Sequence, residues 1–238
     1  MKKVIITGGS RGIGAATVRR FTQAGATVAF IYRSDDSAAK ALSQETGAFA
    51  VKGDISSPEQ ARSATEKCIE LLGGVDVLVN NAGVALIKLF DTVTDEEWRK
   101  LLDTNLSGAF YVTRAVAKEM LGQKSGRIIN IGSVWGRMGA SCEVAYSASK
   151  AALRGFTLSL AKELGPSGIT VNCIEPGVIA TEMNSELDAE SITALKDATP
   201  LCRIGEPTDV ADAVLFLSGE GASFITGQVL GVDGGFCG

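Results

Sequence analysis

The 238-residue chain contains no histidine. This absence excludes hydrolases that pair serine or cysteine with histidine, histidine-ligated metal sites and acid–base catalysis by imidazole. We therefore expect no metal centre of this kind. Any proton transfer needs another donor, and Tyr146 is the best candidate.

The chain also lacks long apolar segments and a strong charge of either sign. The amino-terminal run Val4-Ile5-Ile6 is too short for a signal peptide before glycines and Arg11 interrupt it. Elsewhere, no segment approaches the length needed to span a membrane. The formal net charge is -4, which gives nucleic acid or anionic lipid little to bind. We therefore expect neither nucleic acid nor membrane as a partner.

The cysteines form an odd set without a Cys-x-x-Cys pair. A disulfide framework is not expected from such a set, and a reducing cytoplasm fits it best. We predict packing roles for these residues and a cytoplasmic location. The five are Cys68, Cys142, Cys173, Cys202 and Cys237.

Composition and patterning predict one α/β domain over residues 1–238. The chain is 45% hydrophobic and 21% charged, which is ordinary for a protein with a large buried core. Short β-branched runs alternate with longer amphipathic segments, the pattern of βα units and a parallel sheet. The seven predicted strands are Lys3 to Thr7, Thr27 to Tyr32, Phe49 to Lys52, Val75 to Val79, Arg127 to Ile131, Ile169 to Ile174 and Gln228 to Val232.

Two features of the second half of the chain stand out. Gly165-Pro166 should end the helix that carries Tyr146. The stretch from Glu182 to Arg203 is polar and weakly patterned, and it comes after the carboxyl end of a strand. We predict a mobile substrate lid around residues 182–203.

Small and hydrogen-bonding residues come directly after several predicted strands. In an open parallel sheet, ligands bind beyond the carboxyl ends of the strands, so these segments should meet in one crevice. Glycines in the first segment permit a tight turn and let backbone N–H groups and the next helix approach a pyrophosphate. Each segment alone is also compatible with an ordinary loop. They are Thr7-Gly8-Gly9-Ser10-Arg11-Gly12-Ile13-Gly14, Asn80-Asn81-Ala82-Gly83, Ser133 and Pro176-Gly177-Val178-Ile179-Ala180-Thr181.

Tyr146 and Lys150 lie four residues apart, thirteen residues after Ser133. Four residues is about one helical turn, so the phenol and the ammonium should project from the same face. Alone, such a pair is usually a surface or boundary feature. Beside the strand-end segments, it predicts the catalytic pair of a carbonyl reductase.

Together these motifs resemble the short-chain dehydrogenase/reductase family, and most closely its 3-oxoacyl-(acyl-carrier-protein) reductases. The resemblance spans nearly the whole chain. It implies a Rossmann-type doubly wound parallel sheet of about seven strands with helices on both faces, a nicotinamide cofactor and a homotetramer. It implies a catalytic tetrad of Asn105, Ser133, Tyr146 and Lys150. The cofactor contacts that it implies are Gly8, Ser10, Arg11, Gly12, Ile13, Gly14, Asp54, Ile55, Asn81, Ala82, Gly83, Tyr146, Lys150, Pro176, Gly177, Ile179 and Thr181.

The proposed chemistry requires an acidic phenol. Hydride delivery to a ketone leaves negative charge on oxygen, and a phenol with a pKa of about 10 is a weak proton donor near neutrality. Lowering that pKa by about three units takes about 4 kcal/mol, comparable to one unit charge at about 4 Å in an effective dielectric of about 20. We therefore predict that Lys150 lowers the pKa of Tyr146, the general acid, and binds the nicotinamide ribose. Ser133 would orient the carbonyl, and the resemblance implies that Asn105 holds a water that reprotonates Lys150.

The choice of cofactor depends on the residues directly after the second strand. An acidic side chain there would bind the ribose 2′-hydroxyl of NAD, whereas a cation would favour the 2′-phosphate of NADP. Arg33 comes directly after Tyr32, and Arg11 is a second possible cation. We predict NADP(H) over NAD(H), with Asp54 at the adenine. If the strand continued past Tyr32, Asp35 would reverse the preference.

The resemblance predicts a 3-oxoacyl thioester on acyl carrier protein as the substrate, with Arg127 placed to help to dock the acidic carrier. Two departures from the family pattern weaken this prediction. Ser167-Gly168 lies just before the predicted sixth strand, where members that dock the carrier often have a basic residue. Glu175 stands where the family usually has a small neutral residue. Glu175 would suit an amine-bearing substrate, so a ketone on a modified lysine of elongation factor P is an alternative. A small-molecule alcohol dehydrogenase and a non-catalytic dinucleotide sensor also remain open, although the intact tetrad argues against a sensor.

Overall fold

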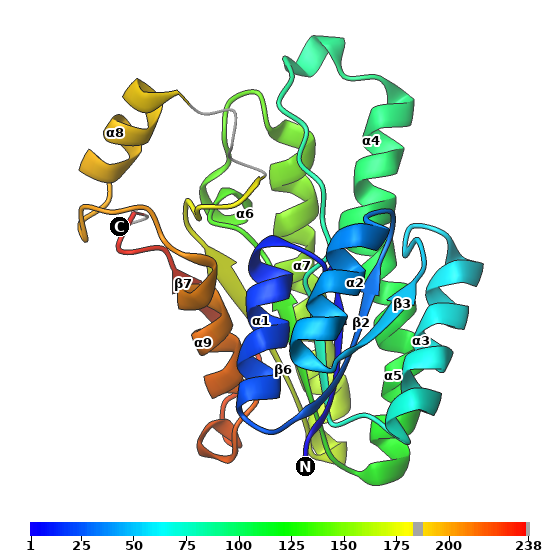
Figure 1. The fold of residues 1–238 in the computed structure, drawn as a ribbon. Coiled ribbons are helices and arrows are strands. Elements are labelled where there is room, and N and C mark those ends of the chain that lie inside the picture. Colours follow the sequence, from blue (N-terminus) through cyan, green and yellow to red (C-terminus); the bar gives the residue numbers. More distant parts are fainter. Residues whose placement is uncertain (183–187, 237–238) are drawn as a thin grey trace.

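The computed structural model describes residues 1–182 and 188–236. Within them, seven parallel strands form one sheet in the order β3-β2-β1-β4-β5-β6-β7 (Figure 1). This order, with its reversal between β1 and β4, is that of a doubly wound Rossmann sheet, so the predicted fold class is confirmed. The strands are β1 (Lys3–Thr7), β2 (Thr27–Tyr32), β3 (Phe49–Lys52), β4 (Val77–Asn80), β5 (Gly126–Ile131), β6 (Ile169–Pro176) and β7 (Val229–Val232).

Helices cover both faces of the sheet (Figure 1). One core cluster packs α1, α2 and α9 against the sheet, and the other packs α3, α5 and α7 against the opposite face. The α-helices are α1 (Gly12–Gln23), α2 (Asp36–Thr46), α3 (Pro58–Leu72), α4 (Asp95–Leu102), α5 (Gly108–Gln123), α6 (Trp135–Met138), α7 (Val144–Leu164), α8 (Ala189–Asp197) and α9 (Pro207–Leu217). Shorter helices are η1 (Phe90–Thr92), the π-helix η2 (Asp103–Ser107), η3 (Gly165–Ser167) and η5 (Glu220–Ala222).

The central strands are apolar throughout because both of their faces are covered. In β1, Val4 and Ile6 belong to the first core cluster, whereas Ile5 belongs to the second. Alternate side chains of a strand point to opposite faces, so each apolar run of this kind contributes to both cores. This burial holds the strand ends, where the predicted site lies, in a fixed arrangement.

The predicted bounds of β1, β2 and β3 are confirmed; β5, β6 and β7 differ by one or two residues at one end, and β4 differs at both ends. β4 begins at Val77 because it pairs there with Val4 of β1. β6 continues past Ile174 to Pro176, which pairs with Val232 of β7. These bounds depend on pairing between distant segments.

The helix that carries Tyr146 ends at Leu164, immediately before Gly165-Pro166, as predicted. The predicted lid is described in part, because residues 183–187 lie outside the described residues. Its helix α8 buries none of its residues and stands apart from the sheet (gold in Figure 1). Among the described helices, none has the length and apolar character required to cross a bilayer.

Candidate functional site

The glycine-rich segment forms a close turn between β1 and α1. Gly8 and Gly12 have φ values of +65° and +53°, which glycine adopts without strain. A Cβ atom at Gly14 would lie 2.1 Å from the carbonyl oxygen of Gly8. Helix α1 receives no side-chain cap from Arg11, so the N–H groups of its first turn are available to an anion. This turn fits a pyrophosphate.

The loop after β4 is tied to the glycine turn through Thr7 and Asn81. Thr7 Oγ1 accepts hydrogen bonds from the backbone N–H groups of Asn81 and Ala82, both at 3.0 Å. Asn81 Nδ2 donates to the carbonyl oxygens of Thr7 and Gly8 at 3.0 and 3.1 Å. This role of Thr7 was not predicted from the sequence, although a hydroxyl at the end of a strand before glycines was a usable signal. The two strand ends thus form one rigid edge of the crevice.

Asn80 has a different position from its neighbours in the same motif. It is the last residue of β4, is 4% exposed, and donates to Thr113 Oγ1 and Asn130 Oδ1 at 2.8 Å each. This first asparagine therefore supports the core beneath the crevice.

Asn105 lies in the π-helix η2 between α4 and α5 and is 1% exposed. Its Oδ1 accepts from Val84 N at 2.8 Å, and its Nδ2 donates to Val84 O and to Ser149 Oγ. A Cβ atom at Gly83 would lie 3.3 Å from both Asn105 Oδ1 and Lys150 Nζ. The structure therefore brings Asn105 and Lys150 together around Gly83.

Tyr146, Lys150 and Ser133 lie together beyond the end of β5. Lys150 Nζ is 5.7 Å from the centroid of the Tyr146 ring and donates to Ile131 O at 2.8 Å. Ser133 is 7% exposed, and its Oγ accepts from Trp135 N at 3.2 Å. The two side chains of α7 share one face, and the serine hydroxyl is their neighbour from the sheet.

The pKa of Tyr146 differs from the predicted direction. Burial raises it to about 12, Glu143 adds to the rise, and a side-chain hydrogen bond with Ser133 offsets part of it. Burial also lowers the pKa of Lys150 to about 8. The predicted direction was wrong because it considered the attraction of a cation for the phenolate and left out desolvation, which is the largest cause of both shifts.

The residues after β2 and β3 form the distal part of the crevice. β2 ends at Tyr32, and Arg33 is exposed beyond it. Asp35 caps α2 by accepting from Ala38 N. The carboxylate of Asp36 accepts from the Tyr32 hydroxyl at 3.0 Å and forms an ion pair with Lys52 at 2.8 Å.

The other predicted cofactor residues also lie at carboxyl ends of strands. Asp54 Oδ1 accepts from the N–H and hydroxyl groups of Ser56, and Ile55 is buried against Gly108. Arg11 forms an exposed ion pair with Glu182 at 3.2 Å. Ile179 is buried. A hollow beside the glycine turn is lined by Ser10, Arg11, Gly12, Ala15, Ala16, Arg19, Arg20, Gln23, Ala38, Ala180, Thr181, Glu182, Glu206, Pro207 and Thr208.

The segment after β6 closes the crevice on its far side. Pro176 O accepts from Val134 N at 3.0 Å, and Gly177 N donates to Val232 O at 3.0 Å. A Cβ atom at Gly177 would lie 2.8 Å from Asp233 Cα, so a glycine is needed there. Thr181 approaches the glycine turn, because a Cβ atom at Gly12 would lie 3.4 Å from its Cγ2.

Glu175, a candidate group for an amine-bearing substrate, pairs with arginines inside the protein. It is 1% exposed and lies between two cations, with its oxygens 3.5 Å from Arg154 Nε and 3.9 Å from Arg137 Nε. Burial raises the pKa of this carboxyl group, and the two arginines oppose the rise. Neither arginine was predicted from the sequence to lie here.

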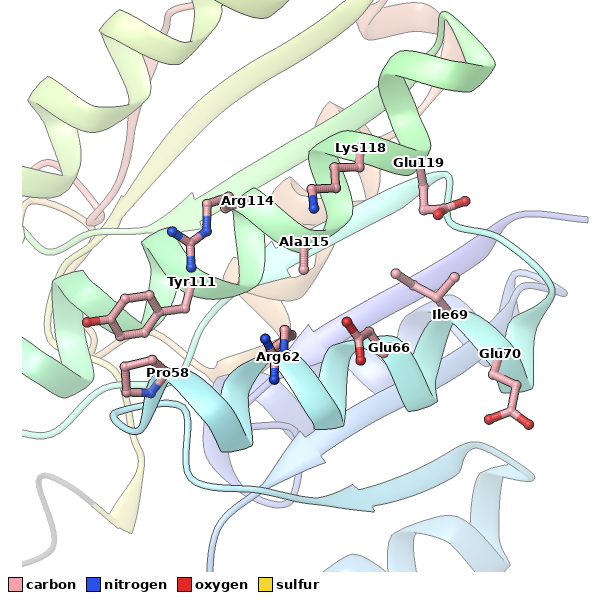
Figure 2. Close-up of a pocket in the computed structure, with 10 residues that line it drawn as sticks. All are labelled: Pro58, Arg62, Glu66, Ile69, Glu70, Tyr111, Arg114, Ala115, Lys118 and Glu119. Carbon is pink, nitrogen blue, oxygen red and sulfur yellow. The ribbon is translucent and has the colours of Figure 1, made fainter.

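A separate hollow lies between α3 and α5, with side chains of both helices facing it (Figure 2). None of the predicted catalytic or cofactor residues lines it. Its lining is Pro58, Arg62, Glu66, Ile69, Glu70, Tyr111, Arg114, Ala115, Lys118 and Glu119. Within the described residues there is also no group of three cysteine or carboxylate side chains suited to a metal ion. The crevice at the strand ends is therefore the candidate site.

Known proteins with similar sequences include reductases, and a protein with a similar structure was solved in complex with NADPH. The 3-oxoacyl-[acyl-carrier-protein] reductase of Aquifex aeolicus is 42% identical over 240 residues, covering 98% of this chain and 96% of its own. The acetoacetyl-CoA reductase of Shinella zoogloeoides is 41% identical over 232 residues, covering 97% and 96%. A blue fluorescent protein from a metagenomic library, solved in complex with NADPH, matches with a TM-score of 0.93 and 43% identity, covering 99% and 98%.

The family profile described as enoyl-(acyl carrier protein) reductase matches residues 8–237. This match and the full-length relatives agree with the motifs found in the crevice. The chain is an oxidoreductase acting on ketone or hydroxyl groups, and it belongs to the short-chain dehydrogenase/reductase family.

Proposed function

We propose that this protein reduces the ketone of a 3-oxoacyl thioester carried on acyl carrier protein, with NADPH as reductant and Tyr146 as proton donor. The observation that carries the proposal is the buried phenol of Tyr146 beside Ser133 and Lys150, at the edge of the sheet that also holds the glycine turn. The names of the relatives, which include reductases of carrier-bound and CoA-bound 3-oxoacyl groups, support the substrate class.

When bound, the nicotinamide supplies the hydride. The hydroxyls of Ser133 and Tyr146 hold the ketone oxygen and polarise the carbonyl. With a pKa of about 12, the phenol is protonated at neutral pH and has a proton to donate as negative charge develops on that oxygen. The ammonium of Lys150 stabilises the resulting phenolate from the same face of α7.

The contacts of the surrounding residues indicate their roles. Asn105 holds the backbone of Val84 on both its N–H and its C=O, and so positions the loop that passes Lys150. The proposed mechanism also includes a water, held by Asn105, that reprotonates Lys150. Exchange with water is favoured by the pKa of about 8 of this lysine, which lets it lose and regain a proton near neutrality.

The preference for NADPH rests on Arg33. β2 ends at Tyr32, which leaves the arginine first beyond the strand. The competing carboxylates are engaged elsewhere, Asp35 as the cap of α2 and Asp36 with Lys52. A cation at this position favours a ribose 2′-phosphate. The structural relative in complex with NADPH supports the same cofactor.

The alternatives have unequal support. An acyl-CoA thioester is favoured by the acetoacetyl-CoA reductase among the relatives. The alternative prediction of a modified lysine on elongation factor P as substrate required that the Glu175 carboxylate face an amine. This carboxylate is instead buried between two arginines. Arg127 lies near the amino end of β5, the edge away from Ser133, so the carrier would reach the crevice without this residue of the same chain.

The deciding experiment measures NADPH oxidation with acetoacetyl thioesters of acyl carrier protein and of CoA. We expect Tyr146→Phe to lower kcat by about 10²- to 10⁴-fold with an unchanged dissociation constant for NADPH. Tyr111→Phe, which removes a phenol at the separate hollow between α3 and α5, is the matched control and should retain full activity. A Tyr146→Phe enzyme that turns over at the normal rate would refute the proton donor. A wild-type enzyme that oxidises NADPH with neither thioester would refute the substrate class.

The quaternary structure is also part of the proposal. Large apolar side chains are exposed on α5 and α7, among them Phe110 at 42% and Leu158 at 44%. Such side chains suit the interfaces of the homotetramer that the family resemblance implies. Light scattering of the purified protein measures the mass directly, and a monomer at micromolar concentration would refute this part.

A further inference from the structure

A buried carboxylate lies where β6 enters the crevice. Glu175 is 1% exposed, and its Oε1 accepts no hydrogen bond from the described residues. The nearest cationic atoms are Arg154 Nε at 3.5 Å and Arg137 Nε at 3.9 Å. A carboxylate removed from water is costly unless cations compensate for it. Glu175 is therefore held by charge, and an uncharged side chain of the same size would lose that attraction.

The two arginines come from the two segments that carry the proposed catalytic hydroxyls. Arg137 belongs to α6, which begins two residues after Ser133. Arg154 lies one turn beyond Lys150 on α7. Arg137 Nη2 also donates to Asp233 Oδ2 at 2.8 Å, in the turn after β7. Glu175 thus connects the ends of β6 and β7 with both segments.

The segments around this cluster approach one another closely. A Cβ atom at Gly136 would lie 2.8 Å from the backbone carbon of Lys150, so α6 rests directly on α7. A Cβ atom at Gly132, the residue before Ser133, would lie 3.1 Å from Glu175 Cγ. Packing sets how closely these segments approach, and the attraction between Glu175 and the arginines pulls them together. Releasing that attraction would let α6 shift relative to α7.

We propose that Glu175 is a positioning residue: by holding Arg137 of α6 and Arg154 of α7, it sets the position of the Ser133 hydroxyl relative to the Tyr146 phenol. The kinetic part of this inference rests on the proposed reductase function, whereas the structural part does not. Glu175 contacts neither substrate nor cofactor in the proposed mechanism, so it acts through the two arginines.

The test uses Glu175→Gln, which keeps the size of the side chain and removes its charge. The chain has two tryptophans, so a Trp98→Phe background leaves Trp135, the first residue of α6, as the single tryptophan, which can be excited selectively over the tyrosines. We expect acrylamide to quench Trp135 more strongly in Glu175→Gln, because α6 is released. We also expect kcat to fall about tenfold or more, with the dissociation constant for NADPH within about twofold of its original value.

A double-mutant cycle tests whether the loss of attraction to Arg154 causes the stronger quenching and the lower kcat. Arg154→Gln should reproduce both effects, and the double variant Glu175→Gln/Arg154→Gln should be no worse than Glu175→Gln alone, because Glu175→Gln already removes the attraction to Arg154. Glu45→Gln, which removes an exposed ion pair with Arg19 at 2.7 Å, is the control and should change neither readout. If Glu175→Gln does not fold, Arg154→Gln decides alone.

The two hypotheses fail separately. Quenching and kcat equal to those of the Trp98→Phe parent would overturn the positioning role, as would strictly additive effects in the cycle. If the Trp98→Phe parent reduces no ketone but acrylamide quenches Trp135 more strongly in Glu175→Gln, the proposed function fails and the structural inference stands.

Discussion

Replacing Lys150 with methionine should stabilise the folded protein near neutral pH while abolishing its activity. Lys150 is 3% exposed, and burial lowers its pKa from 10.5 to about 8. A fall of about 2.5 in pKa corresponds to about 3 kcal/mol that the folded state loses by keeping an ammonium in this position. Methionine has a similar length and carries no charge, so the variant avoids this loss.

The pH dependence of stability distinguishes the removal of the buried charge from other effects of the substitution. Between about pH 8 and pH 10.5, the unfolded chain still carries the proton on Lys150 that the folded chain has released. Stability of the wild type therefore rises with pH across this window, and the variant lacks this rise. The advantage of Lys150→Met should shrink by about 2 to 3 kcal/mol between pH 7 and pH 10. The hydrogen bond from Lys150 Nζ to Ile131 O is absent from the variant at both pH values, so the comparison depends on the charge of Lys150.

Urea unfolding followed by circular dichroism at pH 7 and pH 10 measures this difference. Lys40→Met is the matched control, since Lys40 is exposed on α2 and its ammonium stays in water on folding. The reasoning is refuted if the difference in unfolding free energy between Lys150→Met and wild type is the same at both pH values. It is also refuted if Lys40→Met shows the same pH dependence.

Three further predictions concern the crevice. Arg33→Ala should weaken NADPH binding by about tenfold or more and leave NADH binding unchanged; equal losses measured by fluorescence titration would exclude a phosphate contact. Thr7→Val should destabilise the protein by about 1 to 3 kcal/mol in urea unfolding, because two partly buried N–H groups lose their acceptor; an unchanged midpoint would show that water replaces it. Gly14→Ala should abolish cofactor binding because its methyl group meets Gly8 O, whereas Gly122→Ala, with open space around it on α5, should stabilise the chain by about 0.5 to 1 kcal/mol; calorimetric titration and thermal unfolding compare the two.

The part of the fold that could be predicted is the part encoded locally. β1, β2 and β3 are apolar runs bounded by turn residues or charges, and their ends were predicted to the residue. β6 was predicted too short because its last residue, Pro176, is in the sheet through pairing with Val232, more than fifty residues away. Helix α8 buries none of its residues, so no buried apolar face in the sequence indicates its place.

The candidate site was predictable in its positions and less so in its electrostatics. A parallel sheet places the ends of its strands along one edge, so motifs located after β1, β4 and β5 had to meet there. The direction of the Tyr146 pKa was wrong because burial depends on everything packed around a residue. The partners of Glu175 could not be found from sequence for the same reason, since Arg137 and Arg154 lie in other elements and ordinarily face water.

The opposite shifts of Tyr146 and Lys150 have one cause, and they are compatible with the proposed role of Tyr146 as proton donor. Desolvation moves each pKa toward the neutral form, to about 12 for the phenol and about 8 for the ammonium. A phenol that stays protonated suits the donation of a proton to a ketone, whereas alcohol oxidation begins from the phenolate. At neutral pH most Lys150 side chains still carry their proton, so a cation would lie 5.7 Å from the ring if the phenolate formed as proposed. The burial that makes the phenol reluctant to ionise also removes the water that would weaken this attraction, which favours transfer to the substrate over loss of the proton to solvent.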